Sequence, residues 1–177
     1  QYFSRAATGG VGFAKAAGNY AGSFYPTKKA NARGFTQVIW TDSKEHKYIE
    51  ESGTMNIWFR INDKLITPSL SDSILGGITR DSILKLALDS GIEVEERNVT
   101  VAEILEASQD GTLQEAFGTG TAVAIVAVKS ITLEDIKMNI PTQQDPVSMQ
   151  LKKQLQDLQY GRSKDVLNWI SKINSSI

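Results

Sequence analysis

The sequence has 177 residues, of which 41% are hydrophobic, so one domain with a sizeable core is expected. A formal net charge of −1 excludes a chain built to follow nucleic acid, which needs a basic surface. No apolar run approaches the roughly 20 residues of a membrane-spanning helix, so no membrane partner is expected. The absence of cysteine excludes disulfides and thiolate metal sites and is typical of a reducing compartment such as the cytoplasm.

The start of the chain predicts a strand, a turn and a helix. Residues 1–5 have the pattern of a strand interior, and because no initiator methionine precedes them we expect a fragment or a processed chain. A glycine-rich turn follows and places Lys15. A helix is expected over about residues 23–32, with Pro26 in its first turn and Gly34 as a left-handed stop.

The middle of the chain predicts several strands and one helix. The expected strands are residues 37–40, 57–61, 65–67 and 92–97. A tight Asn62-Asp63-Lys64 turn joins the second of these strands to the third as a hairpin. The helix is expected over about residues 79–90, with Gly91 as its stop.

The last third of the chain predicts two more helices around a strand. Thr100 and Glu103 have the spacing of a capping box, which predicts a helix that ends near Gly111. The apolar run 123–128 predicts a buried strand, and an amphipathic helix is expected around residues 149–158. Because hairpins and helices are mixed, we expect an α+β fold with a mixed sheet, in a single domain that covers residues 1–177.

Four motifs follow one another along the chain. Lys15 stands before a Gly-Asn-Tyr run that ends at Tyr20, and Glu51 opens the run Ser-Gly-Thr-Met-Asn. Gly-Ile-Thr-Arg follows at 77–80 and Thr-Gly-Thr-Ala at 119–122. The series resembles the fold-type IV aminotransferases, which use pyridoxal 5'-phosphate, and within them the branched-chain amino-acid aminotransferases. The resemblance covers nearly the whole chain and implies the C-terminal, cofactor-binding domain of a homodimeric enzyme whose smaller N-terminal domain is missing here.

Lys15 is the residue expected to bind the cofactor's aldehyde as an imine. A lysine amine is nucleophilic only when neutral, and a site shielded from water favours that form. A phosphate-binding P-loop is excluded, because that motif needs Gly-Lys-Ser/Thr whereas Ala14 and Ala16 flank Lys15. The resemblance implies that Lys15 also moves the substrate's α-proton, and that Tyr20 hydrogen-bonds the cofactor's phenolic oxygen.

Glu51 is the acid expected at the cofactor's ring nitrogen. The cofactor withdraws electrons best when that nitrogen is protonated. A carboxylate at about 4 Å is worth on the order of 4 kcal/mol at an effective dielectric constant of about 20. Glu50 is the competing acid, and on an extended strand the two side chains are expected to point in opposite directions. The resemblance assigns the role to Glu51.

The cofactor's phosphate needs backbone N–H groups and hydroxyls, ideally at the start of a helix. The expected helix opens on two glycines, so we expect phosphate contacts from the backbone of Ile78 and Thr79 and from the Thr79 hydroxyl. The resemblance implies that Thr121 also touches the phosphate. It further implies that Thr54 and the amide of Ala122 bind the substrate's carboxylate.

The implied activity is transamination in branched-chain amino-acid biosynthesis, from leucine, isoleucine or valine to 2-oxoglutarate. Two rivals share the fold: a D-amino-acid aminotransferase and an aminodeoxychorismate lyase. A third alternative is a non-catalytic fragment.

The remaining aromatic and metal-binding candidates have simpler interpretations. His46, the single histidine, is expected in an exposed loop, and Trp40, Trp58 and Phe59 are expected in the core. No cluster of Asp, Glu and His has the spacing of a metal site, so no metal is expected.

Overall fold

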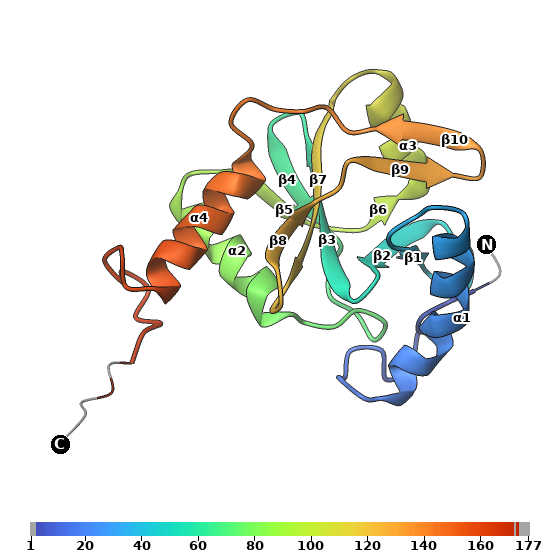
Figure 1. Ribbon diagram of the computed structural model, residues 1–177, viewed down its shortest axis with the longest axis horizontal. Coiled ribbons are helices and arrows are strands. Elements are labelled where there is room, and N and C mark those ends of the chain that lie inside the picture. The colour runs from blue at the N-terminus through green and yellow to red at the C-terminus, as the bar shows by residue number, and fades with distance from the viewer. Residues whose placement is uncertain (1–2, 172, 174–177) are drawn as a thin grey trace.

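An eight-stranded sheet forms the centre of the protein (Figure 1). The computed structural model describes residues 3–171 and 173. The strands of this sheet are β1 (Ile39–Thr41), β2 (Tyr48–Ser52), β3 (Met55–Ile61), β4 (Lys64–Thr67), β5 (Val94–Glu96), β6 (Val99–Thr100), β7 (Leu113–Gly120) and β8 (Ala124–Ala127). A separate hairpin consists of β9 (Ser130–Leu133) and β10 (Ile136–Asn139).

Strand β3 organises the large sheet. One edge of β3 pairs with β7, and the other edge pairs first with β2 and then with β4, all antiparallel. The next pair, β4 with β5, is parallel, because α2 connects these strands by a crossover. The expected α+β class with a mixed sheet is therefore confirmed.

Helices and the small hairpin cover both faces of the sheet. The helices are α1 (Gly18–Ala32), α2 (Ile78–Asp89), α3 (Val101–Gln109) and α4 (Val147–Gln159). Helices α2 and α4 lie on one face, while α3 and the β9–β10 hairpin lie on the other (Figure 1). Side chains of β3 alternate between the two cores: Trp58 packs under α2 and α4, and Ile57 and Phe59 pack under α3. The expected burial of Trp40, Trp58 and Phe59 is confirmed.

Local sequence signals place several element boundaries correctly. Asn62 and Asp63 have φ angles of 50° and 65°, as a two-residue type I′ hairpin between β3 and β4 requires. The Thr100 hydroxyl accepts a hydrogen bond from the Glu103 N–H at 3.0 Å and caps α3. Gly91 has a φ of 73° and ends α2 as expected.

The first helix differs from the expectation. Helix α1 begins at Gly18, five residues before the expected start at 23, so Pro26 lies inside the helix rather than in its first turn. Pro26 is the buried residue of α1 and cannot donate a helical hydrogen bond. Residues 3–5 form no strand, and residues 1–2 lie outside the described residues.

The sheet also contains strands that the sequence pattern does not predict. Strands β2, β6 and β7 of this sheet are additional, and so are β9 and β10 of the separate hairpin; β7 extends to Gly120, into the Thr-Gly-Thr-Ala motif. The expected buried strand at 123–128 is β8, which pairs with β7 and buries only Ile125, whereas Val126 is 39% exposed. An apolar run thus marks a strand here, but its outer face lies at the surface.

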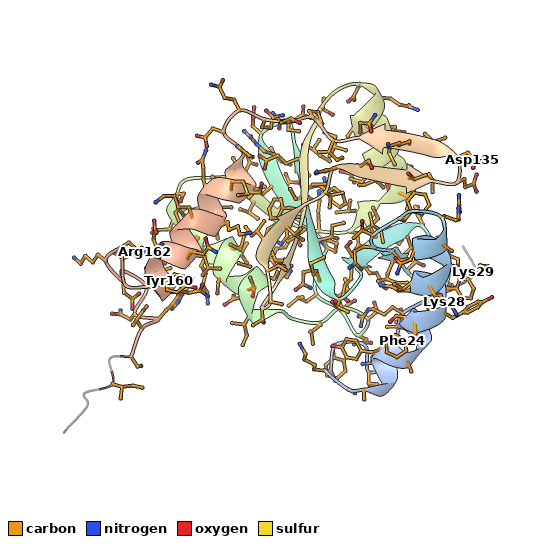
Figure 2. All side chains as sticks on the ribbon, viewed as in Figure 1. Phe24, Lys28, Lys29, Asp135, Tyr160 and Arg162 are labelled. Atoms are coloured by element: carbon orange, nitrogen blue, oxygen red, sulfur yellow. The ribbon has the colours of Figure 1, made fainter. Side chains whose placement is uncertain are left out.

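Helix α1 and the end of α4 lie on opposite sides of the molecule. Figure 2 shows Phe24, Lys28 and Lys29 along α1, and Tyr160 and Arg162 beyond α4. His46 lies in the β1–β2 loop, where it is half-buried rather than exposed, with Nδ1 at 3.1 Å from the Thr41 hydroxyl. Over residues 3–171 and 173, no helix has the length and apolar character needed to cross a membrane.

Candidate active site

The expected site residues lie at one end of the sheet, on loops and at the ends of helices and strands. Glu51 and Asn56 are paired across β2 and β3, and Asn56 is in turn paired with Thr119 of β7. This register sets the β2–β3 turn, with Thr54, beside the β7–β8 turn, with Thr121 and Ala122. The segment that leads into α2 and the loop that carries Lys15 reach the same end (Figure 1).

The lysine loop, residues 8–17, rests against a bridging segment, residues 71–75. The Phe13 N–H donates to the Asp72 carbonyl at 2.9 Å, and the Gly9 N–H donates to the Asp72 carboxylate at 3.1 Å. A Cβ on Gly12 would lie 2.7 Å from the Cα of Ser73, so only glycine permits this approach. The lysine loop therefore has a fixed position, while Lys15 itself is exposed.

Asn19 fixes the lysine loop from the other side. Its Nδ2 atom donates to the carbonyls of Val11 at 2.7 Å and Ala14 at 2.8 Å. Since Ala14 precedes Lys15, this side chain controls the direction in which the chain enters α1. Tyr20, the next residue of α1, is half-buried.

Glu51 is a buried carboxylate with partners on both oxygens. Its Oε1 accepts a hydrogen bond from the Leu75 N–H at 2.8 Å, and its Oε2 lies 2.9 Å from Nε of Arg5, without hydrogen-bond geometry. Burial raises the pKa of Glu51 to about 7, against the lowering effects of Arg5 and of the Leu75 N–H, and the nearby Glu50 adds a smaller upward effect. A carboxylate offers about four lone pairs, so these contacts leave capacity for a further donor.

Glu50 and Glu51 do not point apart as expected for an extended strand. The pairing of β1 with β2 shifts register here, with Trp40 opposite Glu51 and Thr41 opposite Ile49, which leaves Glu50 as the extra residue of a β-bulge. The Ser73 hydroxyl donates to Glu50, so both carboxylates contact the bridging segment. Burial raises the pKa of Glu50 as well, while the Ser73 hydroxyl and Arg5 lower it.

The glycine loop, residues 76–79, follows the bridging segment and opens α2. Gly77 is the N-cap of α2 and has no side chain to accept from the first amides, so the N–H groups of Ile78 and Thr79 are available to an anion. The Ile78 side chain is 83% exposed, and Thr79 is half-buried. The guanidinium of Arg80 turns away to the Pro68 carbonyl and to Glu96.

Not every expected residue makes a direct contact with another. Within the described part of the chain, no hydrogen bond or ion pair joins Lys15, Tyr20 or Thr121 to Glu51. Thr54, Thr121 and Ala122 are exposed at the sheet end. The bridging segment connects the lysine loop to Glu51, and the turns with Thr54, Thr121 and Ala122 lie at the same end of the sheet.

Three further residues of this site have no expected role in the sequence. Arg5 pairs with Glu51 and donates to the carbonyls of Gly12 and Ser73. Asn19 stands inside the Gly-Asn-Tyr run and Asn56 inside the Thr-Met-Asn run, so the motifs could have identified both residues. No motif in the sequence surrounds Arg5.

The arrangement suits a flat, polar ligand with three different ends. The buried acid can hold a protonated ring nitrogen, the free amides of α2 can hold a phosphate, and the exposed lysine can reach an aldehyde. These donors and acceptors fit pyridoxal phosphate, which carries all three groups.

Comparisons with known proteins identify the family of the chain. The family model described as "Amino-transferase class IV" matches residues 14–131. A probable branched-chain-amino-acid aminotransferase from Staphylococcus epidermidis is 45% identical over 168 residues, which are 94% of this chain and 47% of the relative. The chain therefore spans about half the length of the curated relatives it matches.

Solved structures give the same result for the fold. The branched-chain amino acid aminotransferase from Escherichia coli has a TM-score of 0.80 at 31% identity and covers 98% of this chain and 56% of its own. The T.th. branched-chain amino acid aminotransferase in complex with N-(5'-phosphopyridoxyl)-L-glutamate has a TM-score of 0.80 at 27% identity, over 98% of this chain and 55% of its own.

Proposed function

The chain belongs to the class IV aminotransferases, and from that premise we propose that it is the cofactor-binding domain of a branched-chain amino-acid aminotransferase. One observation carries the proposal. The buried Glu51 carboxylate binds the N–H of Leu75, and the next residues open the uncapped start of α2. The acid proposed for the ring nitrogen therefore binds the residue just before the loop whose N–H groups are proposed to bind the phosphate.

Pyridoxal phosphate, when bound, supplies an electron sink for the charge that develops as a proton leaves the substrate's α-carbon. Glu51 keeps a proton on the ring nitrogen, and its negative charge acts strongly there because the site is buried. The amides of Ile78 and Thr79, with the hydroxyls of Thr79 and Thr121, hold the phosphate.

The reacting end of the site consists of four residues. The Nζ atom of Lys15 would hold the cofactor through its aldehyde; once the amino group of the substrate displaces Nζ there, the released amine would accept the α-proton of the substrate and later return it. Tyr20 donates to the phenolic oxygen. Thr54 and the Ala122 amide hold the carboxylate of the substrate, which orients the bond to the α-proton.

The proposed substrates are leucine, isoleucine or valine as amino donors and 2-oxoglutarate as acceptor. Relatives named as branched-chain aminotransferases support the donors. The acceptor is supported by the T.th. structure, whose ligand joins the phosphopyridoxyl group to glutamate. Glutamate is the product that 2-oxoglutarate gives when it accepts an amino group.

The proposal includes a larger assembly. Residues 1–177 form the cofactor-binding domain, and a smaller domain completes the substrate pocket in a cytoplasmic homodimer. The length of the relatives, about twice that of this chain, supports the second domain. Two aromatic side chains on α1 are largely exposed, Phe24 at 71% (Figure 2) and Tyr25 at 62%, and are available to a neighbouring domain or subunit.

An absorbance titration tests the proposal. Pyridoxal phosphate added to the protein should give a visible band that leucine shifts and D-alanine leaves unchanged. Lys15→Ala should abolish the band, whereas Lys28→Ala, which removes another exposed lysine on the outer side of α1, should retain it (Figure 2). A band that survives in Lys15→Ala would refute the role of this lysine, and a response to D-alanine alone would favour the D-amino-acid aminotransferase.

A further inference from the structure

Two side chains hold the two polar groups of a single residue, Leu75. The Nδ2 atom of Asn56 donates to the Leu75 carbonyl at 2.8 Å, and Glu51 accepts from the Leu75 N–H at 2.8 Å. Both can reach it because Glu51 and Asn56 are directly opposite each other on β2 and β3, where paired side chains share a face. Asn56 is 5% exposed, so its amide is committed to this contact.

The other end of the same amide borders the glycine loop. A Cβ on Gly77 would lie 2.3 Å from Oδ1 of Asn56. Gly77 has a φ of −70°, which any residue can adopt, so the close approach of Asn56 is what requires a glycine here. Asn56 therefore holds the residue before the glycine loop and packs against the second residue within it.

We propose that Asn56 is a positioning residue for the phosphate end of the cofactor, which acts by holding the carbonyl of Leu75, while Glu51 holds the N–H of the same residue. The Leu75 carbonyl and the Gly76 N–H belong to one planar peptide. Holding the carbonyl therefore fixes the direction of the first N–H of the glycine loop. This inference rests on the proposed function, because it assumes that the loop binds the phosphate of pyridoxal phosphate.

The phosphate group itself provides a direct test in binding titrations of the whole protein. Asn56→Ala should weaken the binding of pyridoxal phosphate about tenfold, as expected for the loss of one buried hydrogen bond to the loop. Pyridoxal, which lacks the phosphate, should bind with an affinity changed by less than about twofold. Thr67→Val is the matched control: it also removes a 2.8 Å hydrogen bond from a buried side chain to a backbone carbonyl, that of Ile57.

A second variant tests the contact with the glycine loop. Gly77→Ala should weaken binding of pyridoxal phosphate, because its methyl group meets Oδ1 of Asn56. In the Asn56→Ala background the nearest remaining atom is Cβ of Arg80 at 3.6 Å, an ordinary contact, so the added methyl should cost little. Effects that multiply independently in the double variant would overturn the inference.

The titrations separate this inference from the proposed function. Equal losses for pyridoxal phosphate and pyridoxal in Asn56→Ala, or the same losses in Thr67→Val, show a merely structural role and overturn the inference alone. A wild-type protein that binds neither compound overturns the proposed function, and the inference with it.

Discussion

The Nε atom of Arg5 lies 2.9 Å from Oε2 of Glu51, and the two side chains are only 5% and 4% exposed. Burial favours the neutral form of the acid, and Arg5 favours the charged form. The resulting pKa of about 7 means that Glu51 gains or loses its proton near neutral pH in the protein without cofactor. This balance has consequences for stability and for catalysis.

The stability of the cofactor-free protein should fall as the pH rises between about 4.5 and 7. The pKa of Glu51 is raised from 4.5 to about 7 in the folded state, so in this range the folded state binds more protons than the unfolded state. The contribution is complete below pH 4.5 and is lost by pH 7, a change on the order of 3 kcal/mol in the free energy of unfolding.

Urea unfolding of wild type and Glu51→Gln across this range measures the contribution. The variant cannot titrate at position 51, so its free energy of unfolding should change less than that of wild type over this pH range, and the difference should equal the contribution of Glu51. Subtracting the two curves removes the effect of Glu50, whose pKa is also raised by burial. Parallel curves would contradict the assignment of the titration to Glu51.

The same variant should retain the cofactor but lose turnover. Glutamine keeps the shape of Glu51 and can still accept from the Leu75 N–H, so the loop geometry survives. Without the charge, the ring nitrogen is less readily protonated, and turnover of leucine should fall about a hundredfold or more. The control is Glu106→Gln, which alters an exposed acid on α3; equal rates for the two variants would exclude the proposed role.

Asn19 should control how readily Lys15 reacts. Asn19→Ala removes both hydrogen bonds to the lysine loop, at Val11 and Ala14, so the loop samples more positions. We expect the visible band to form about tenfold more slowly after pyridoxal phosphate is added, with thermal stability little changed because α1 buries few side chains. Asn31→Ala, at the exposed end of α1, serves as the control, and an unchanged rate in Asn19→Ala would rule out this anchoring role.

The features that the sequence predicts correctly depend on neighbouring residues. The turn at Asn62 and Asp63 and the cap at Thr100 are decided within four residues, and the structure shows both. The bulge at Glu50 and the pair between Arg5 and Glu51 depend on residues that meet only after folding. Period-two alternation therefore gives the wrong direction for Glu50.

The residues of the candidate site also divide into those that a local motif marks and those that no motif marks. The motifs mark Lys15, Glu51 and Thr79, because each stands in a recognisable run. The bridging segment, residues 71–75, has no such run, yet it contacts the lysine loop through Asp72 and Glu51 through Leu75. The contacts of Leu75 and of the Asp72 carbonyl use backbone groups, which every residue carries, and the side chains of Asp72 and Ser73 stand in no recognisable motif, so the sequence alone does not distinguish them.

Helix α4 should depend on a single acid of β7. Glu115 is 5% exposed and accepts from the N–H groups of Val147 and Ser148, at 2.8 and 3.1 Å, and from the Ser148 hydroxyl at 2.6 Å. The N-cap residue Pro146 has no side-chain hydrogen bond of its own, so Glu115 supplies the cap from another element. Arg60 lies 3.3 Å from the same carboxylate.

Glu115→Ala should therefore lower the free energy of unfolding by about 3 kcal/mol, because it leaves buried donors and Arg60 without their acceptor. Urea unfolding measures the loss, and Glu106→Ala on the exposed side of α3 should cost less than about 0.5 kcal/mol. The affinity for pyridoxal phosphate at low urea should not change, since Glu115 contacts none of the proposed cofactor residues. A loss of affinity in Glu115→Ala, or equal stability losses in the two variants, would show that the acid acts differently from a cap on α4.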